Sequence, residues 1–135
     1  MNGKYKNPIK HDLLTIKNNT MLNLAHKNLE VYKISLLLVK EVYLITKFYP
    51  KEELYVLVSQ LRRAAISVCS NIAEGSARSS KLERKRFYEI SRSSLVEIET
   101  QIEISVLLGY TEPKKTIELD KSMESIFKML SKLIT

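Results

Sequence analysis

Cysteine, glycine and proline are scarce in this sequence, and each shortage excludes a class of structure. The single cysteine, Cys69, permits neither an intramolecular disulfide nor a cysteine-based zinc cluster, and it suits a reducing compartment. Three glycines and three prolines in 135 residues leave few places to turn the backbone, which indicates a few long helices. No apolar run of about 18 residues occurs, and the N-terminus lacks the apolar core of a signal peptide. We therefore expect one cytoplasmic domain and no membrane span.

Patterns that carry catalysis or bind metals are also missing. The two histidines, His11 and His26, precede the first predicted helix, so no Glu-x-x-His pair can form a metal site inside a bundle. No Walker A, G-x-G-x-x-G, H-E-x-x-H or G-x-S-x-G sequence occurs. Cys69 has no histidine nearby in sequence, which favours a small core residue over a nucleophile. Three carboxylates could supply acid–base chemistry but have the spacing of a solvated helix face: Glu97, Glu99 and Glu103. We expect no catalytic residue, metal or cofactor, and no enzyme.

The hydrophobic pattern predicts two helices in the first half of the domain. Between residues 28 and 49, apolar residues recur at spacings of three and four, and Pro50 ends the segment. This seam comprises Val31, Ile34, Leu38, Val42, Ile45 and Phe48. A second helix is predicted over residues 51–74, with Gly75 as its terminator. Its seam comprises Leu54, Leu57, Leu61, Ala64, Val68 and Ile72, widened by Val58 and Ala65.

Two further helices follow a polar turn. Ser79 or Ser80 is the expected N-cap of a helix that runs to Leu108 and ends at Gly109. Its seam alternates apolar and small hydroxyl residues: Phe87, Ser91, Ser94, Leu95, Ile98, Ile102 and Ser105. Such hydroxyls can return a hydrogen bond to the preceding helical turn and allow tight packing. The sequence Thr111-Glu112-Pro113 is predicted to open the last helix, whose stripe comprises Leu119, Met123, Ile126, Leu130 and Leu133. Long helices joined by short loops predict an all-α, antiparallel up-and-down four-helix bundle over residues 28–135.

Apolar residues outside these seams predict a homo-oligomer. On the first helix Leu37 and Leu44 project close to a stripe of lysines, and Leu36 widens the apolar surface. On the third helix Val96, Ile104 and Leu107 point away from the seam. Arg63 belongs to a polar stripe on the second helix that is either solvated or in contact with another subunit. The candidate oligomer interface is therefore Leu36, Leu37, Leu44, Arg63, Val96, Ile104 and Leu107.

Positive charge is concentrated in two regions of a chain whose net charge is +7. Residues 1–27, interpreted as a basic N-terminal extension, carry a net charge of +4 and include Lys4, Lys6, Lys10 and Lys17. The second region has six basic residues against two glutamates: Arg78, Lys81, Arg84, Lys85, Arg86 and Arg92. Free amides at a helix N-terminus, flanked by a turn at Gly75 and by Arg78, Ser79 and Ser80, indicate a phosphate-binding end. The alternatives are a solubilising tail and charge pairing between subunits.

Several motifs in the predicted helices resemble one bacterial family. Gln60-Leu61-Arg62-Arg63-Ala64-Ala65, followed by Ser70-Asn71-Ile72-Ala73-Glu74-Gly75, is similar to the signature of the 23S rRNA-intervening sequence proteins. Leu29-Glu30-Val31-Tyr32, Phe48-Tyr49-Pro50, Ser93-Ser94-Leu95-Val96-Glu97, Gln101-Ile102-Glu103-Ile104 and Leu108-Gly109-Tyr110 agree with it. The resemblance covers roughly residues 24–133 and places Arg62, Arg63, Asn71, Glu74 and Glu97 on signature positions.

The resemblance implies a barrel-like homopentamer of four-helix bundles. It also extends to the accessory variability determinants of diversity-generating retroelements, which associate with a reverse transcriptase and nucleic acid. The function expected from the sequence is a noncatalytic, basic binding or scaffold protein that contacts RNA or DNA through phosphates. The alternative is an accessory subunit that binds a reverse transcriptase or another protein.

Overall fold

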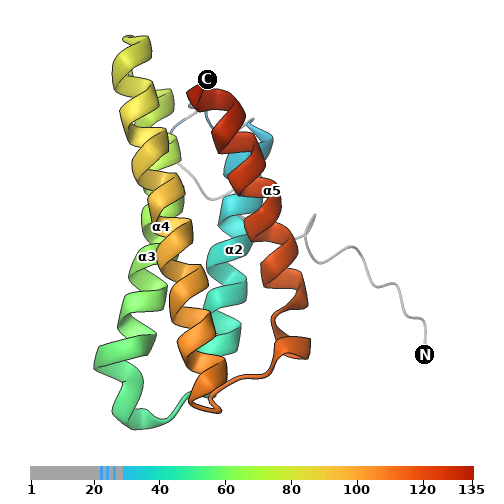
Figure 1. The fold of residues 1–135 in the computed structure, drawn as a ribbon. Coiled ribbons are helices and arrows are strands. Elements are labelled where there is room, and N and C mark those ends of the chain that lie inside the picture. The colour runs from blue at the N-terminus through green and yellow to red at the C-terminus, as the bar shows by residue number, and fades with distance from the viewer. Residues whose placement is uncertain (1–21, 23, 25, 27–28) are drawn as a thin grey trace, which may run out of the picture.

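A computed structural model describes residues 22, 24, 26 and 29–135, and within them it contains helices and no strand. The main helices are α2 (Glu30–Thr46), α3 (Ser59–Ser76), α4 (Lys81–Leu107) and α5 (Ile117–Ile134). They run up and down, with α2 and α4 each packed against both α3 and α5 (Figure 1). The predicted all-helical fold of four main helices is confirmed. Most of the predicted 1–27 extension, including Lys4, Lys6, Lys10 and Lys17, lies outside the described residues.

The core contains most of the predicted seam residues. Leu38, Val42, Leu61, Val68 and Ile72 are fully buried between α2 and α3, and Leu95, Ile98, Leu119, Ile126 and Leu130 complete the centre from α4 and α5. Three seam predictions are wrong: Phe48, Leu54 and Leu133 are exposed. Phe48 and Leu54 lie outside regular α-helix, and Leu133 lies in the last turn of α5, on its exposed face. Tyr88 is buried where Phe87 was expected, and Ile134 where Leu133 was expected.

The second helix begins irregularly. A 3-10 turn (η2, Lys51–Glu53) leads into a π-helical turn (η3, Leu54–Val58), and regular α-helix starts only at Ser59. Glu53 stabilises this start because its carboxylate accepts hydrogen bonds from the Leu57 amide (3.3 Å) and from the Tyr110 hydroxyl (3.2 Å). The wider π turn rotates Leu54 and Tyr55 away from the seam, and this explains why Leu54 is exposed.

Gly75 does not end α3, contrary to the prediction. The helix continues through it to Ser76, and Gly109 is the glycine with a positive φ, +78°. Gly75 instead permits a close approach to α4. A Cβ atom at this position would lie 2.9 Å from Cε1 of Tyr88 and 3.0 Å from Cβ of Phe87. The Tyr88 hydroxyl shares a 2.9 Å hydrogen bond with Ser76 beside this contact.

Hydroxyl groups join α3 to α4 below Gly75. The Ser91 hydroxyl donates to the carbonyl of Val68 across the interface (2.8 Å), and Ser67 and Ser94 hydrogen-bond each other at 2.9 Å. The predicted hydrogen bond from a serine hydroxyl back to the preceding helical turn is present at Ser94, which donates to the Ile90 carbonyl (3.2 Å), and at Ser105, which donates to the Gln101 carbonyl. Small side chains therefore let the two helices pack closely while their polar atoms stay paired.

The two ends of the α4–α5 connection differ in how well they were predicted. Gly109 ends α4 as expected, in a Schellman arrangement where the Tyr110 amide donates to the Ser105 carbonyl (2.9 Å). Thr111 is not the cap of α5. A 3-10 turn (η4, Pro113–Lys115) intervenes, and α5 begins after Thr116. Pro113 favours the tight turn because its ring fixes φ, and the Thr116 hydroxyl returns a hydrogen bond to its carbonyl (2.9 Å).

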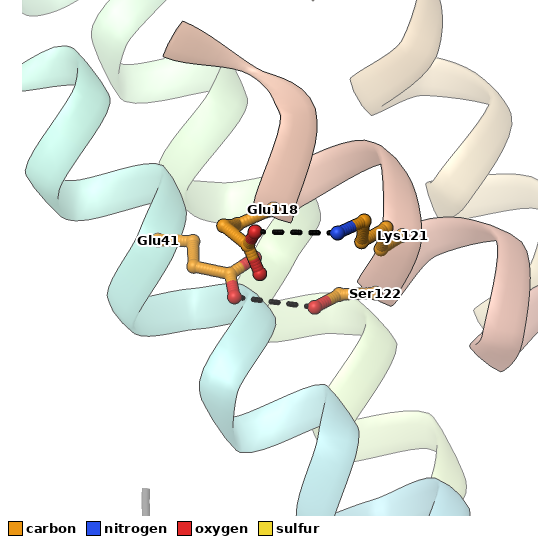
Figure 2. Close-up of polar contacts among 4 residues, drawn as sticks. All are labelled: Glu41, Glu118, Lys121 and Ser122. Atoms are coloured by element: carbon orange, nitrogen blue, oxygen red, sulfur yellow. Dashed lines mark hydrogen bonds and ion pairs between the residues drawn. The ribbon is translucent and has the colours of Figure 1, made fainter. Parts of the chain in front are cut away.

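A carboxyl group lies between α2 and α5. Glu41 accepts a hydrogen bond from the Ser122 hydroxyl (3.2 Å), and its second oxygen is buried without a hydrogen-bond partner. Figure 2 shows the Glu118 carboxylate beside it, paired with Lys121 at 3.5 Å. Burial raises the pKa of Glu41 to about 7; the Ser122 hydrogen bond opposes this rise and the Glu118 charge adds to it.

Candidate nucleic-acid interface

The predicted basic region forms the tip of the α3–α4 hairpin, which extends beyond the ends of α2 and α5 (Figure 1). Ser80 caps α4, as expected, by accepting a hydrogen bond from the Glu83 amide (3.4 Å). The turn between the helices spans only residues 77–80, so the cations at the end of α3 and in the first turns of α4 are held near one another.

Two arginines of the tip hold the turn together. The Arg84 guanidinium donates from Nη1 to the carbonyls of Arg78 (3.0 Å) and Ser79 (2.8 Å). Arg78 places its guanidinium over the Phe87 ring, 4.8 Å from the centroid. Both side chains keep their charge at the surface while they brace the turn. Replacing either residue would therefore test the stability of the turn as well as ligand binding.

The other four cations occupy three positions on α4. Lys81 and Lys85 are exposed and one helical turn apart on the same face, whereas Arg86 is exposed about 100° further round α4. Arg92 lies on the side of Lys81 but about 16 Å further along the helix axis. There it stacks over Phe127 of α5 (5.7 Å) and donates to the Ser131 hydroxyl (3.1 Å). The structure thus brings Arg78, Lys81, Arg84 and Lys85 together and separates Arg92 from them.

The charge pattern of α4 opposes the helix dipole. The helix has its cations at the N-terminal end, where the dipole favours negative groups. Its last 15 residues, 93–107, contain three glutamates and no lysine or arginine, where the dipole favours cations. The arrangement is therefore unfavourable for the isolated helix, and this points to a role for the charges outside it.

The backbone at the tip offers fewer free donors than expected. Ser80 engages the amides of both Glu83 and Arg84, through its hydroxyl and its carbonyl. The geometry of a first turn leaves the amides of Lys81 and Leu82 without an intrahelical acceptor. Gly75 contributes no turn here, which is a correction to the predicted glycine-flanked phosphate site. Any anion would rely mainly on side-chain cations.

Residues at the signature positions divide into two groups. Arg62 connects α3 to α2, since its Nε donates to the Thr46 hydroxyl (3.0 Å) and its guanidinium lies 4.4 Å from the centroid of the Tyr43 ring. Asn71 donates to the Ser67 carbonyl (2.8 Å) within α3. These two have structural roles in the single subunit. The second group is exposed: Arg63, Glu74 and Glu97.

The candidate oligomer residues are unequally accessible. Leu44, Val96, Ile104, Leu107 and Arg63 are exposed, whereas Leu36 and Leu37 are partly buried within the subunit. The sequence interpretation missed three strongly exposed apolar residues: Phe48, Tyr55 and Leu82. Leu82 could have been found, because it lies outside the helical phase of the α4 seam.

Neither a reactive thiol nor a cluster of metal ligands occurs among the described residues. Cys69 is a buried core residue, as predicted; its thiol donates to the Ser35 hydroxyl (3.1 Å), and burial raises its pKa to about 11. Among the described residues, no group of three or more His, Cys, Asp or Glu side chains could hold a metal ion. No helix in the described part of the chain is long and apolar enough to cross a membrane.

Comparisons with known proteins agree with this architecture. A family model described as 23S rRNA-intervening sequence protein matches residues 27–132. The chain is also similar to a solved structure from Bacteroides thetaiotaomicron, described as a protein with unknown function from the S23 ribosomal protein family. That similarity has a TM-score of 0.71 at 21% sequence identity and covers 78% of this chain and 98% of the other, so it supports the fold. A search of curated proteins found no match.

Proposed function

The chain belongs to the 23S rRNA-intervening sequence protein family, and from this premise we propose that it is a noncatalytic, oligomeric protein that binds nucleic acid through phosphate contacts. The observation that carries the proposal is the hairpin tip, where exposed Lys81, Lys85 and Arg86 adjoin the braced Arg78 and Arg84. The helix dipole disfavours cations at the N-terminal end of α4, and binding of an external polyanion would explain why these cations lie there.

Contacts of this kind attach to the nucleic-acid backbone. Lysines on an exposed helix face neutralise phosphates without reading base edges, so affinity should depend on salt and little on sequence. The braced arginines add fixed positive charge at small entropic cost, because the turn already orders them. The tip thus favours polyanion binding of low sequence specificity.

The decisive experiment removes the three exposed cations while keeping the two braced arginines. We expect Lys81→Gln, Lys85→Gln and Arg86→Gln together to weaken binding to two unrelated 20-nucleotide RNAs equally, measured by fluorescence anisotropy. The plot of log affinity against log salt should become shallower by about 2, at roughly 0.7 per lost phosphate contact with single strands. A matched control, Lys51→Gln, Lys114→Gln and Lys115→Gln, removes the same charge at the opposite end of the bundle. Equal slopes for the two triple variants would refute binding at the tip.

Assembly into a homo-oligomer is a second part of the proposal. Apolar side chains that the subunit leaves exposed support it, including Leu44 and Leu107. Leu44→Lys with Leu107→Lys is expected to lower the mass seen in light scattering and to preserve helicity in circular dichroism. Leu82→Lys, at the exposed hairpin tip, is the control and should leave the mass unchanged. An unchanged mass in the double variant would place the interface elsewhere.

A further inference from the structure

Helix α2 places an acidic side chain against α5 in largely apolar surroundings. One helical turn before and after Glu41, the residues of α2 are all aliphatic: Leu37, Leu38, Leu44 and Ile45. Lys40 is adjacent in sequence but projects about 100° away around the helix. The polar contact of Glu41 comes instead from α5, whose Ser122 hydroxyl donates to one oxygen of the carboxyl group (Figure 2). Glu41 therefore joins two helices rather than stabilising its own.

Glu41 forms no ion pair with any residue in the described part of the chain. On α5, Glu118 faces it and Lys121 is close by, but the Lys121 ammonium pairs with the Glu118 carboxylate (Figure 2). On α3, which packs against another side of α2, Arg62 is hydrogen-bonded to Thr46, about 140° from Glu41 around the helix. The charge that acts on Glu41 across the interface is therefore that of another carboxylate.

The second oxygen of Glu41 can be satisfied in this position only with a proton. Oε2 is buried without a hydrogen-bond partner, and an ionised carboxylate can only accept. A protonated Glu41 can donate, and the Glu118 carboxylate beside it is an acceptor (Figure 2). Burial raises the pKa of Glu41 from 4.5 to about 7, and the Glu118 charge adds to the rise. The contact is therefore strongest at acid pH and weakens as the pH rises through about 7.

Helix α5 has few polar links to the other helices. Within the described residues, hydrogen bonds join it to α2 at Ser122 and to α4 at Ser131, which accepts from Arg92 (3.1 Å). The α3–α4 pair is locked more firmly, by the Ser91 hydrogen bond and by the close approach at Gly75. A helix held mainly by its apolar stripe can open while the rest of a bundle stays folded.

We propose that Glu41 and Glu118 form a pH-dependent switch between α2 and α5, closed when the two carboxyl groups share a proton and opened when both are ionised. Opening releases α5 at the η4 turn and leaves the α3–α4 hairpin folded. It exposes the apolar stripe of α5, which comprises Leu119, Met123, Ile126 and Leu130. The switch does not depend on nucleic-acid binding at the hairpin tip.

Hydrogen-exchange mass spectrometry of the full chain at pH 5 and pH 8 tests the switch. Protection factors, which correct for the intrinsic exchange rate at each pH, should be about tenfold lower for peptides of α5 than for peptides of α3 at both pH values, because α5 opens separately. The protection of α5 should also fall by roughly fivefold or more from pH 5 to pH 8.

Two variants assign this loss of protection to the switch. Glu41→Gln imitates the protonated carboxyl group, because its amide can accept from Ser122 and donate to Glu118. Its α5 protection should differ by less than about twofold between pH 5 and pH 8, since the switch stays closed. Glu124→Gln is the matched control; Glu124 is an exposed carboxylate of α5 that pairs with Lys128 (2.9 Å), and its removal should leave the wild-type pH dependence.

Three results would overturn the proposal. Equal protection of α5 and α3 would show that α5 opens only when the whole bundle unfolds. An α5 protection that is the same at pH 5 and pH 8 in the wild type would show that no proton controls the contact. A loss of α5 protection at pH 8 that persists in Glu41→Gln would place the responsible proton on another group.

Discussion

Glu41 should make the stability of this protein depend on pH. Glu41→Gln keeps the shape of the side chain and removes its ionisation, so it isolates the effect of the charge between α2 and α5. Burial raises the pKa of this carboxyl from 4.5 to about 7. At about 1.36 kcal/mol per pH unit this corresponds to roughly 3 kcal/mol, and solvent screening of a partly buried group reduces it to about 1–2 kcal/mol.

The sign of the effect follows from proton linkage. Below about pH 4.5 the folded and unfolded chains both hold the proton, and Glu41 imposes no penalty on folding. Between pH 4.5 and 7 the unfolded chain releases the proton first, so the folded state loses stability as pH rises. Above about pH 7 both states are ionised and the full penalty remains. The glutamine variant should escape this loss.

Urea unfolding followed by circular dichroism, at one protein concentration, measures the effect. We expect the variant and the wild type to have similar free energies of unfolding at pH 4.5, and the variant to be about 1–2 kcal/mol more stable at pH 8. Glu118→Gln is the control; this exposed neighbour contributes a smaller share of the Glu41 shift, so its effect should be weaker. A stability difference that is the same at both pH values would refute the argument from burial.

Three further predictions follow from close packing and backbone geometry. Gly75→Ala should lower the free energy of unfolding by about 1–3 kcal/mol in urea titrations, because the clash of the new Cβ with the Tyr88 ring outweighs the higher helix propensity of alanine. A more stable variant would show that the ring can move. Gly109→Ala should cost about 1 kcal/mol in the same assay because φ is +78° there, and no loss would mean that the turn rearranges. Cys69 should react with a disulfide reagent at pH 8 at least a hundredfold more slowly in the folded than in the denatured chain, because it is buried and its pKa is raised to about 11. Absorbance monitors the reaction, and comparable rates in the two states would contradict the burial of Cys69.

Helical periodicity predicted the centre of the bundle well and its ends poorly. Leu38, Val68 and Ile98 lie in mid-helix, where spacings of three and four fix the buried face, and all three are fully buried. Phe48 lies beyond the last regular turn of α2, where the helical phase no longer determines direction. Gly75 was misread because glycine serves both as a helix terminator and as a point of close contact, and only the position of Tyr88 separates the two roles.

The candidate site was predictable as a concentration of charge but not as a geometry. Sequence order placed the six cations of residues 78–92 near one helix start. It could not show that Arg84 binds two carbonyls of the turn, or that Arg92 lies on Phe127 of α5. Such contacts depend on the approach of separate helices, which local spacing does not encode.

The contact of Gly75 with Tyr88 bears on the order of folding. Sliding α3 past α4 by one helical turn would bring the side chain of Asn71 against the Tyr88 ring in place of the bare Gly75 backbone. The contact therefore selects a single alignment of the two helices, and it closes a loop of only about 13 residues, for which the entropic cost is low. We expect the α3–α4 hairpin to appear early in the folding transition state, before α2 and α5 dock, with φ-values near Tyr88 higher than those near Glu41.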